Sequence, residues 1–386
     1  MSDITSTISQ KAAKMFQDAA TILETGTSVS RTRVAVTGLG SELGESVVAE
    51  ACAAAAAKGY AVYYLGTVNV PGAVSIVCAD EEACAAEMAR LLKSGECDAA
   101  VTMHHLFSIG TATVGRVVTP SRGKEMFIST TTGTPSTDRT ESLVLGALYG
   151  IITAKACGIV HPTVGILNID GARRAETALN KLIQRGFPME LAESARADGG
   201  AVLRGNDILL GTSDVLVCDP LTGNVLMKML SAFTTGGNRE CSGYGYGPCV
   251  GRGEKNPIMI VSRASDTPVI FNAILYAAEV HEGRIVKITE EVLSLADKCG
   301  LREILAVPKQ ADSETGGEEV KPPGREPVTE EISGIEVTDI EDAARLLWKN
   351  GVYAESGMGC TGPVVMVSEK NHTRAVELLR TAQYVE

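Results

Sequence analysis

The chain has 386 residues, 45% of them hydrophobic, a length and composition that predict two or three domains with large aliphatic cores. Its formal net charge of -12 argues against binding to nucleic acid or to an anionic membrane surface, because both need basic patches. Ten cysteines without a Cys-x-x-Cys pair, and only five histidines, give little support to a metal site or a disulfide scaffold. We therefore expect no metal, no membrane span, reduced thiols and a cytoplasmic location.

The first half of the chain alternates between predicted strands and helices. Residues 8–24 carry apolar side chains at helical spacing, so residues 1–30 are assigned to a leading helix. Buried strands are then predicted at 33–37, 61–65, 74–78, 99–103, 126–129 and 164–169, with helices at 46–58, 81–93 and 143–157. This alternation predicts a doubly wound α/β/α sheet with right-handed crossovers.

A glycine-rich turn lies between the first strand and the first helix of that pattern. Gly38, Gly40 and Gly44 resemble a dinucleotide-binding fingerprint, but their spacing is one residue too long. The second strand ends in Leu65, Gly66 and Thr67, with no acid to bind a ribose. A tight turn without a ligand is favoured, an anion site at the helix start is the next alternative, and no organic cofactor is expected.

The second half of the chain continues the alternation and then changes in composition. Further strands are predicted at 215–218 and 258–261, with helices at 225–234 and 268–281, so residues 31–307 form an α/β core. Residues 308–334 are rich in proline, glycine and acid and are interpreted as a linker. Residues 335–386 are predicted to form a small α+β module, in which Thr338 and Glu341 form a capping box.

Polar residues follow three of the predicted strands, where ligands of such sheets bind. Asp219, Thr222, Gly223 and Asn224 follow strand 215–218 and could bind a polar ligand, although an N-cap uses the same residue types. Two further candidate groups are Thr132 with Gly133, in a threonine-rich loop after strand 126–129, and His104 with His105 after strand 99–103. A solvated loop explains the threonines equally well, and a structural pair explains the histidines.

One cysteine lies in a context that favours chemistry. Cys360 is part of Gly357-Met358-Gly359-Cys360-Thr361-Gly362, where glycines let the backbone approach a ligand closely. An acyl-transfer thiol must be accessible and partly ionised, and backbone N–H groups aimed at the developing charge assist it. Most cysteines serve packing, and those in alanine-rich helices, such as Cys52 and Cys84, are interpreted in that way.

Several segments, in the same order along the chain, resemble the phosphate acyltransferases of phospholipid synthesis. The segments are residues 143–155, 158–169, 206–208, 214–219 and Thr222-Gly223-Asn224. The resemblance covers roughly residues 31–305 and implies a fold shared with phosphate acetyltransferases and isocitrate-dehydrogenase-like proteins, with two α/β lobes around a cleft. It also implies formation of an acyl phosphate from inorganic phosphate. Residues 103–106, Met-His-His-Leu, depart from that family and put its long-chain acyl-carrier substrate in doubt.

The whole chain, including the linker and the Cys360 module, resembles the alpha subunits of component C of glycine/sarcosine/betaine reductase. This resemblance implies that an acetyl group from a carboxymethyl selenoether on selenoprotein component A becomes a thioester on Cys360, which phosphate releases as acetyl phosphate. It implies a thiolase-like beta subunit as partner, and it aligns a second cysteine with Cys97. A stand-alone acyl-carrier phosphate acyltransferase and a non-catalytic scaffold for a thiolase-like partner are the two alternatives.

Overall fold

The computed structural model describes residues 32–195, 200–306, 322–332, 335, 340–359, 362–382 and 384–385, together with Leu23. The chain divides into two compact units, Met1–Leu305 and Ala306–Glu386, and each is described by itself. Apart from Leu23, the predicted leading helix over residues 1–30 lies outside the described residues.

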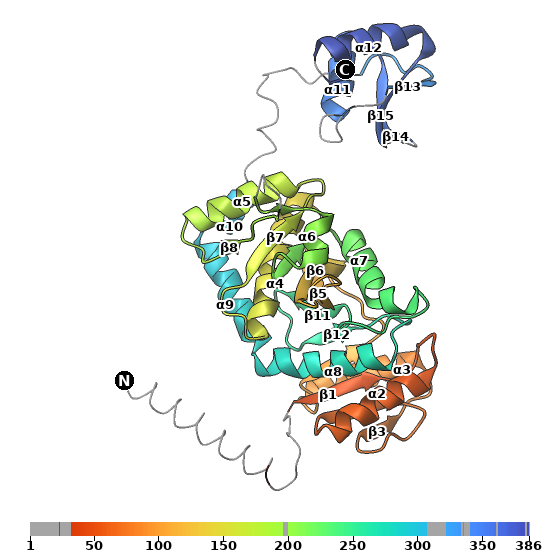
Figure 1. Cartoon of the computed structure of the whole chain (residues 1–386), viewed down its shortest axis with the longest axis vertical. Coiled ribbons are helices and arrows are strands. Elements are labelled where there is room, and N and C mark those ends of the chain that lie inside the picture. Colours follow the sequence, from red (N-terminus) through yellow and green to blue (C-terminus); the bar gives the residue numbers. More distant parts are fainter. Residues whose placement is uncertain are drawn as a thin grey trace. The chain divides into compact units, whose positions relative to one another are not determined.

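The larger unit is built on one twelve-stranded mixed sheet (Figure 1). Its strands are β1 (Arg33–Thr37), β2 (Ala61–Gly66), β3 (Val74–Val77), β4 (Ala99–Thr102), β5 (Thr111–Val118), β6 (Glu125–Thr134), β7 (Thr163–Leu167), β8 (Glu190–Leu191), β9 (Val202–Leu203), β10 (Val215–Val217), β11 (Gly247–Gly251) and β12 (Ile258–Ile260). They lie in the order β3-β2-β1-β4-β12-β11-β5-β6-β10-β7-β8, with β9 also beside β7. β11 thus joins a β1–β4 half of the sheet to a β5–β10 half.

Helices cover the sheet, so the predicted α/β class is confirmed. They are α2 (Glu45–Ala57), α3 (Glu81–Ser94), α4 (Arg139–Ala156), α5 (Ala172–Gln184), α6 (Gly205–Leu210), α7 (Pro220–Ala232), α8 (Thr267–Glu282), α9 (Ile285–Lys298) and α10 (Leu301–Ala306), with a 3₁₀ turn η1 (Phe233–Thr235) after α7. α4 is the central helix and is buried over most of its length, as its apolar sequence requires. A Cβ on its Gly150 would lie 2.2 Å from Val215, so glycine permits the close approach of α4 to β10.

The centre of the sheet differs from the predicted pattern. β5 and β11 are antiparallel strands that the apolar pattern of the sequence did not predict. Glycine and threonine stand at positions where buried strands usually have aliphatic residues. The predicted loop at Thr130–Thr134 is also wrong, because these residues continue β6 and pair with β5. Threonine is β-branched and suits a strand, and here its hydroxyls find partners across the ladder.

The smaller unit contains a three-stranded antiparallel sheet in the order β13-β15-β14. Its elements are β13 (Glu330–Ile332), α11 (Ile340–Lys349), β14 (Ala354–Gly359), β15 (Gly362–Val367), η2 (Glu369–Asn371) and α12 (His372–Thr381). The linker predicted over 308–334 therefore ends too late, since β13 pairs with β15 and Ile332 is buried. Residues 355–359, predicted as a loop, belong to β14. Cys360 itself lies outside the described residues.

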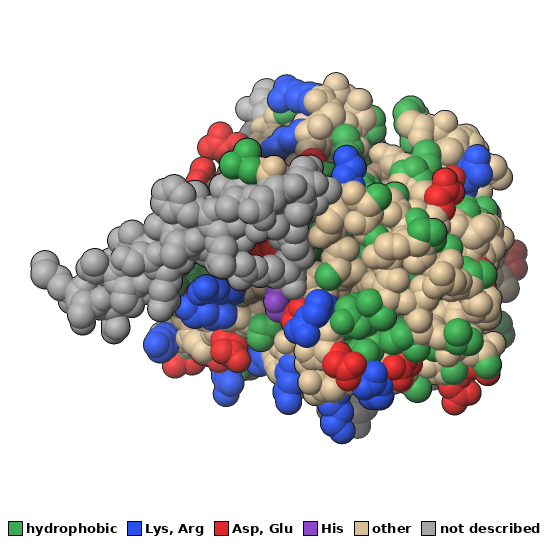
Figure 2. All heavy atoms as spheres, turned by 90° about the horizontal axis from the view of Figure 1, so that it is seen from below, with side chains coloured by type: hydrophobic (Ala, Val, Ile, Leu, Met, Phe, Trp, Pro, Cys, Tyr) green, Lys and Arg blue, Asp and Glu red, His purple; other side chains and the backbone are tan. Residues whose placement is uncertain are grey.

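The described surface bears on the expected binding classes. On the face shown in Figure 2, lysine and arginine side chains are interspersed with acidic ones, without an extended basic surface. Within the part of the chain that the structure describes, no helix combines the length and apolar character needed to cross a membrane. Nor do three or more His, Cys, Asp or Glu side chains of these residues form a group that could hold a metal ion.

Candidate active site

Asp219 is the N-cap of α7. Its Oδ1 accepts hydrogen bonds from the backbone N–H groups of Leu221 and Thr222, both at 3.0 Å, and its Oδ2 accepts one from the Thr222 hydroxyl at 2.5 Å. Asp219 thus acts as an N-cap, which is one of the two roles that the residue types of this segment allowed. The carboxylate already uses these first-turn N–H groups, so the start of α7 does not offer them to a phosphate.

The next residues hold α7 against β6. A Cβ on Gly223 would lie 2.0 Å from the carbonyl oxygen of Thr130, so only glycine permits this approach. At the next residue, Asn224, the side-chain Nδ2 lies 3.5 Å from the carbonyl oxygen of Thr131. The amide is therefore held loosely, at the limit of a hydrogen bond, beside the end of β6.

The threonines of β6 bond to one another and to β5. The Thr113 hydroxyl lies 2.6 Å from that of Thr131 and 2.8 Å from that of Thr132, which is only partly buried. Gly133 has a φ of 82° and lies against the Thr111 carbonyl. Because β6 and β10 are parallel neighbours, the structure brings the Asp219–Asn224 segment and the threonine group together at one edge of the sheet.

The two histidines do not share this edge. They follow β4, and β12, β11, β5 and β6 lie between β4 and β10 in the sheet. The antiparallel pairings of β12 with β11, β11 with β5 and β5 with β6 make β4 and β10 run in opposite senses, so their carboxyl ends lie at opposite edges. His104 is exposed, whereas the ring of His105 contacts Phe107 edge-on and burial lowers its pKa.

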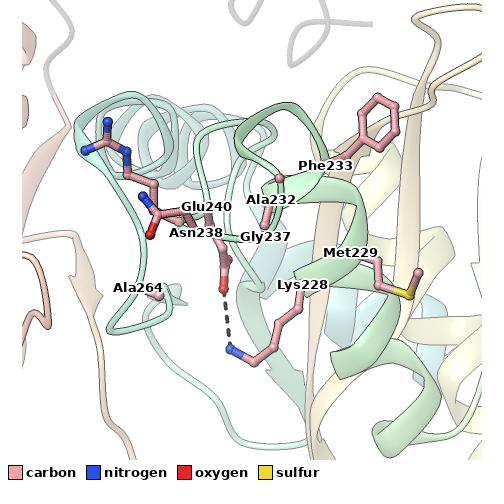
Figure 3. A pocket seen from close by; sticks show the side chains of 10 residues that line it. Lys228, Met229, Ala232, Phe233, Gly237, Asn238, Glu240 and Ala264 are labelled. Atoms are coloured by element: carbon pink, nitrogen blue, oxygen red, sulfur yellow. Dashed lines mark hydrogen bonds and ion pairs between the residues drawn. The ribbon is translucent and has the colours of Figure 1, made fainter.

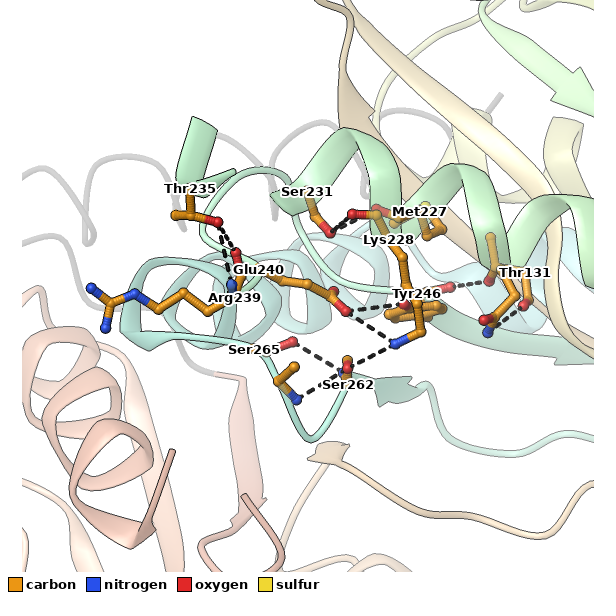
Figure 4. A network of polar contacts seen from close by, with 12 residues as sticks. Thr131, Met227, Lys228, Ser231, Thr235, Arg239, Glu240, Tyr246, Ser262 and Ser265 are labelled. Carbon is orange, nitrogen blue, oxygen red and sulfur yellow. Dashed lines mark hydrogen bonds and ion pairs between the residues drawn. The ribbon is translucent and has the colours of Figure 1, made fainter. Parts of the chain in front are cut away.

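A polar network that sequence reasoning missed runs along α7 from the threonine group (Figure 4). The Thr131 hydroxyl donates to the carbonyl oxygen of Tyr246 at 2.7 Å, and the Tyr246 hydroxyl donates to Glu240 Oε1 at 3.2 Å. The Lys228 ammonium lies 3.4 Å from the same carboxylate oxygen and 3.4 Å from Ser262 Oγ. Burial, followed by the Glu240 charge, raises the pKa of Tyr246, which therefore stays protonated at neutral pH.

A pocket of about 520 Å³ opens beside this network (Figure 3). Its walls come from the end of α7, the loop after it and Ala264, in the loop between β12 and α8. Lys228 and Glu240 face each other across the pocket, while Met229 and Phe233 lie on the α7 side. Lys228 is the single charged residue of α7, so a lone lysine in an otherwise uncharged helix was the available signal.

Burial raises the pKa of several described cysteines and makes them poor nucleophiles. Cys97 is buried, and burial raises the pKa of its thiol to about 12. Cys84 has the same pKa, about 12, for the same leading cause. A thiol with such a pKa is protonated at neutral pH, so Cys97, which the resemblance aligns with a second cysteine of the family, is a protonated core residue.

The glycine-rich turn before α2 is filled by side chains of the protein. The Tyr64 hydroxyl would lie 2.3 Å from a Cβ on Gly38, and it donates to the Glu45 carboxylate at 2.6 Å. The backbone N–H of Thr67 donates to the same carboxylate at 2.6 Å. A phosphate at this helix start would meet a negative charge, so the turn without a ligand is the favoured alternative.

Comparisons with known proteins point in one direction. A family model described as "Fatty acid synthesis protein" matches residues 32–366. A glycine/sarcosine/betaine reductase complex component C subunit alpha from Peptoclostridium acidaminophilum is 49% identical over 383 residues, 98% of this chain and 100% of that protein. A phosphate acyltransferase from Thermus thermophilus is 31% identical over 51% of this chain and 70% of its own length. The crystal structure of a branched-chain phosphotransacylase from Enterococcus faecalis matches 65% of this chain and 99% of its own, with 18% identity and a TM-score of 0.45.

Proposed function

Because the chain belongs to the fatty acid synthesis protein family and to the family of component C alpha subunits of glycine/sarcosine/betaine reductase, we propose that it is the acetyl-phosphate-forming subunit of such a complex. The observation that carries this proposal is the 49% identity over 98% of the chain, which includes the Cys360 module. The identity to a phosphate acyltransferase supports acyl transfer to phosphate. The subunit acts in a cytoplasmic hetero-oligomer with a thiolase-like beta subunit and selenoprotein component A.

The proposed reaction ends in an acyl transfer to phosphate. The carboxymethyl group that component A carries on selenium reaches Cys360 as an acetyl thioester. A thiol of component A bonds to the selenium and the carbon–selenium bond breaks, so the selenium and that thiol are oxidised together while the methylene carbon takes up a proton and becomes a methyl group. The Cys360 sulfur bonds to the carboxyl carbon, and one carboxylate oxygen leaves as water. A phosphate oxygen then bonds to the thioester carbonyl carbon, the carbon–sulfur bond breaks, and Cys360 leaves as a thiolate. Backbone N–H groups stabilise the negative charge that develops on the carbonyl oxygen. Inorganic phosphate is a substrate, and the reaction as proposed uses no organic cofactor or metal.

The cluster at the carboxyl ends of β6 and β10 is the proposed phosphate site. The Asn224 amide and the Thr132 hydroxyl are the proposed contacts, since both residues are partly exposed and the Asn224 amide is only loosely engaged. Asp219 and Thr222 act as positioning residues, because their mutual hydrogen bonds hold the start of α7. Gly223 and Gly133 let α7 and β5 approach β6 closely, which keeps these groups at one edge of the sheet.

His104 and His105, the predicted candidates for a general base, lie at the opposite edge of the sheet from the proposed phosphate site. A general base has to lie within hydrogen-bond reach of the reacting group, so the proposal assigns them no role in the transfer to phosphate. His105→Asn should therefore leave the rate of acetyl phosphate formation unchanged, in contrast to Asn224→Ala.

The experiment that tests the function uses the reconstituted complex and measures acetyl phosphate. Cys360→Ser should abolish its formation, because a serine hydroxyl has no comparable activated anion. Cys241→Ser, at a partly buried free cysteine, is the matched control and should leave the rate unchanged. Asn224→Ala should slow phosphate-dependent release by roughly 10²–10³, whereas Asn272→Ala, at another partly buried amide, should not.

The two alternative functions predict different outcomes in the same assay. A stand-alone phosphate acyltransferase would form acyl phosphate from an acyl carrier without component A. A scaffold would leave acetyl phosphate formation dependent on the partner's own cysteine, so Cys360→Ser would react at the wild-type rate.

A further inference from the structure

One face of α7 carries a row of exposed apolar side chains. Leu221, Val225, Met229 and Phe233 follow one another at intervals of four residues and are 75%, 46%, 66% and 70% exposed. Side chains four residues apart lie on one face of a helix, and the 3₁₀ turn η1 extends the row by Phe233. With a rise of about 1.5 Å per residue, the row is roughly 18 Å long. Exposed apolar surface of this extent is typical of interaction sites.

The row ends at the pocket described above. Met229 and Phe233 belong to both, and Ala232 and Ala264 add apolar wall (Figure 3). Met229 and Phe233 therefore connect the apolar row to the wall of the pocket. The row and the pocket together are called the α7 surface below.

Within the pocket, Glu240 lacks one hydrogen bond. The residue is 3% exposed, and its Oε1 contacts the Lys228 ammonium and the Tyr246 hydroxyl. Its Oε2 is buried and accepts no hydrogen bond from any described residue. A buried acceptor without a partner is costly, so a ligand that donates here gains more than an ordinary hydrogen bond.

The charges around Glu240 define the donor. Lys228 already pairs with Glu240, and Arg239 Nε lies 3.2 Å from Asp266, so each cation beside the pocket has an anionic partner. If a second cation bound Glu240, its charge would be removed from water without an anion of its own to compensate it, which is costly. A neutral N–H group is therefore the better donor, and it has to lie next to an apolar group that fits beside Met229 and Phe233.

We propose that the α7 surface is where the other subunit of component C docks, placing apolar side chains along the row and donating a backbone N–H to Glu240 Oε2. A polypeptide offers apolar side chains beside neutral N–H groups over such a length, which a small molecule or an acyl chain does not. A second copy packed through its own α7 fits less well, because the apolar row has no neutral donor and the helix N–H groups are used internally. The relative from Peptoclostridium acidaminophilum is a subunit alpha, a name that implies a second subunit.

The inference rests on the proposed function in one respect, because it requires that a second subunit exists. The network from Glu240 through Tyr246 to Thr131 connects the α7 surface to the proposed phosphate site. Docking would therefore bring the second subunit beside the helix whose start holds Asn224.

The test measures the affinity of the full-length chain for the beta subunit. Met229→Asp and Phe233→Asp should each weaken binding roughly tenfold or more, as expected for central residues of an interface. Glu240→Gln should also weaken it, because the new amide hydrogens oppose the donated N–H. Val77→Asp and Val160→Asp, at side chains that are 81% and 69% exposed elsewhere, are the matched controls and should bind like the wild type. Thermal unfolding of each variant checks that the fold is retained.

Three results would overturn the inference. They are wild-type affinity of both Met229→Asp and Phe233→Asp, a photo-crosslinker at position 233 that captures a second copy of this chain, and one that captures component A. Acetyl phosphate release from a small-molecule acetyl thioester, measured on the same variants without the beta subunit, separates the two proposals. Failure of docking leaves that release unchanged, whereas failure of the proposed function abolishes it in the wild type as well.

Discussion

Two partly buried charge clusters of the larger unit differ in how completely their groups are paired. Arg116, 12% exposed, forms ion pairs with Glu125 and Glu279, and its guanidinium lies 4.4 Å from the centre of the Tyr244 ring. The Tyr244 hydroxyl also donates to Glu125 at 2.5 Å. Around Glu240, by contrast, both polar contacts exceed 3.1 Å and one carboxylate oxygen has no partner.

This difference in pairing distinguishes a cluster that stabilises the fold from a cluster that can bind a ligand. A buried polar network in which every member is paired rigidifies the fold, whereas one with an unpaired member costs free energy until something binds. The Arg116 guanidinium, a planar fork, engages two carboxylates at once, while the Lys228 ammonium is a flexible point charge that is 54% exposed. The first cluster should therefore govern stability and the second should govern binding.

The largest expected effect follows from removing the centre of the paired cluster. Arg116→Met should lower the free energy of unfolding of the larger unit by roughly 3 kcal/mol. This is the lower end of the range for broken buried pairs, because Glu125 and Glu279 keep partial access to water. Urea unfolding of the full-length protein measures it. A loss below about 1 kcal/mol would mean that the cluster is not a structural centre.

A smaller effect is expected at the start of α7. Asp219→Ala removes an acceptor from two backbone N–H groups and should cost about 1 kcal/mol, whereas Asp219→Asn should cost much less because asparagine also caps helices. Urea unfolding compares the two variants with the wild type. Equal losses in both would show that the charge matters and that the cap does not.

Glu240→Gln should change stability least. The free energy of unfolding should stay within about 1 kcal/mol of the wild type, because Tyr246 keeps an acceptor and the half-exposed Lys228 regains water. The same urea titration supplies the value. A loss as large as that of Arg116→Met would erase the distinction between the two clusters.

The pH dependence of stability sharpens the comparison further. Burial raises the pKa of Glu125, but hydrogen bonds from Tyr244 and Arg116 outweigh it and hold the pKa below its ordinary value of 4.5. The stability that this carboxylate contributes is therefore present above pH 4.5 and lost as the pH falls through the lower, folded-state pKa. Unfolding measured between pH 6 and about pH 3 should fall less steeply in Arg116→Met than in the wild type. Equal slopes would contradict the role given to Arg116.

The sequence was informative where one local rule decides the structure. The alternation of apolar runs predicted β1, β2 and the helix α2 between them. The sequence Asp219-Pro220 allowed an N-cap as one of two alternatives, and the structure shows that cap. Prediction failed at β11 and at Thr130–Thr134, because glycine and threonine take strand conformation there only through pairing with β5. Pairing of this kind depends on tertiary context rather than on local propensity.

The candidate site was predicted in part for the same reason. Asn224 and Thr132 were selected from separate motifs, and the parallel pairing of β6 with β10 brings them to one edge. Lys228 and Glu240 lie twelve positions apart, with the end of α7 and a glycine turn between them, so no periodicity relates them. The opposite sense of β4, which separates the histidines from this edge, depends on the unpredicted strands β5 and β11.

The most direct test of the central claim is mass spectrometry of the Cys360 peptide in the wild-type complex. With acetyl donor supplied and phosphate withheld, the account predicts an acetyl adduct on Cys360. Addition of phosphate should then remove the adduct while an equal amount of acetyl phosphate is released. An acetyl group found only on the beta subunit, or an adduct on Cys360 that phosphate does not discharge, would contradict the account.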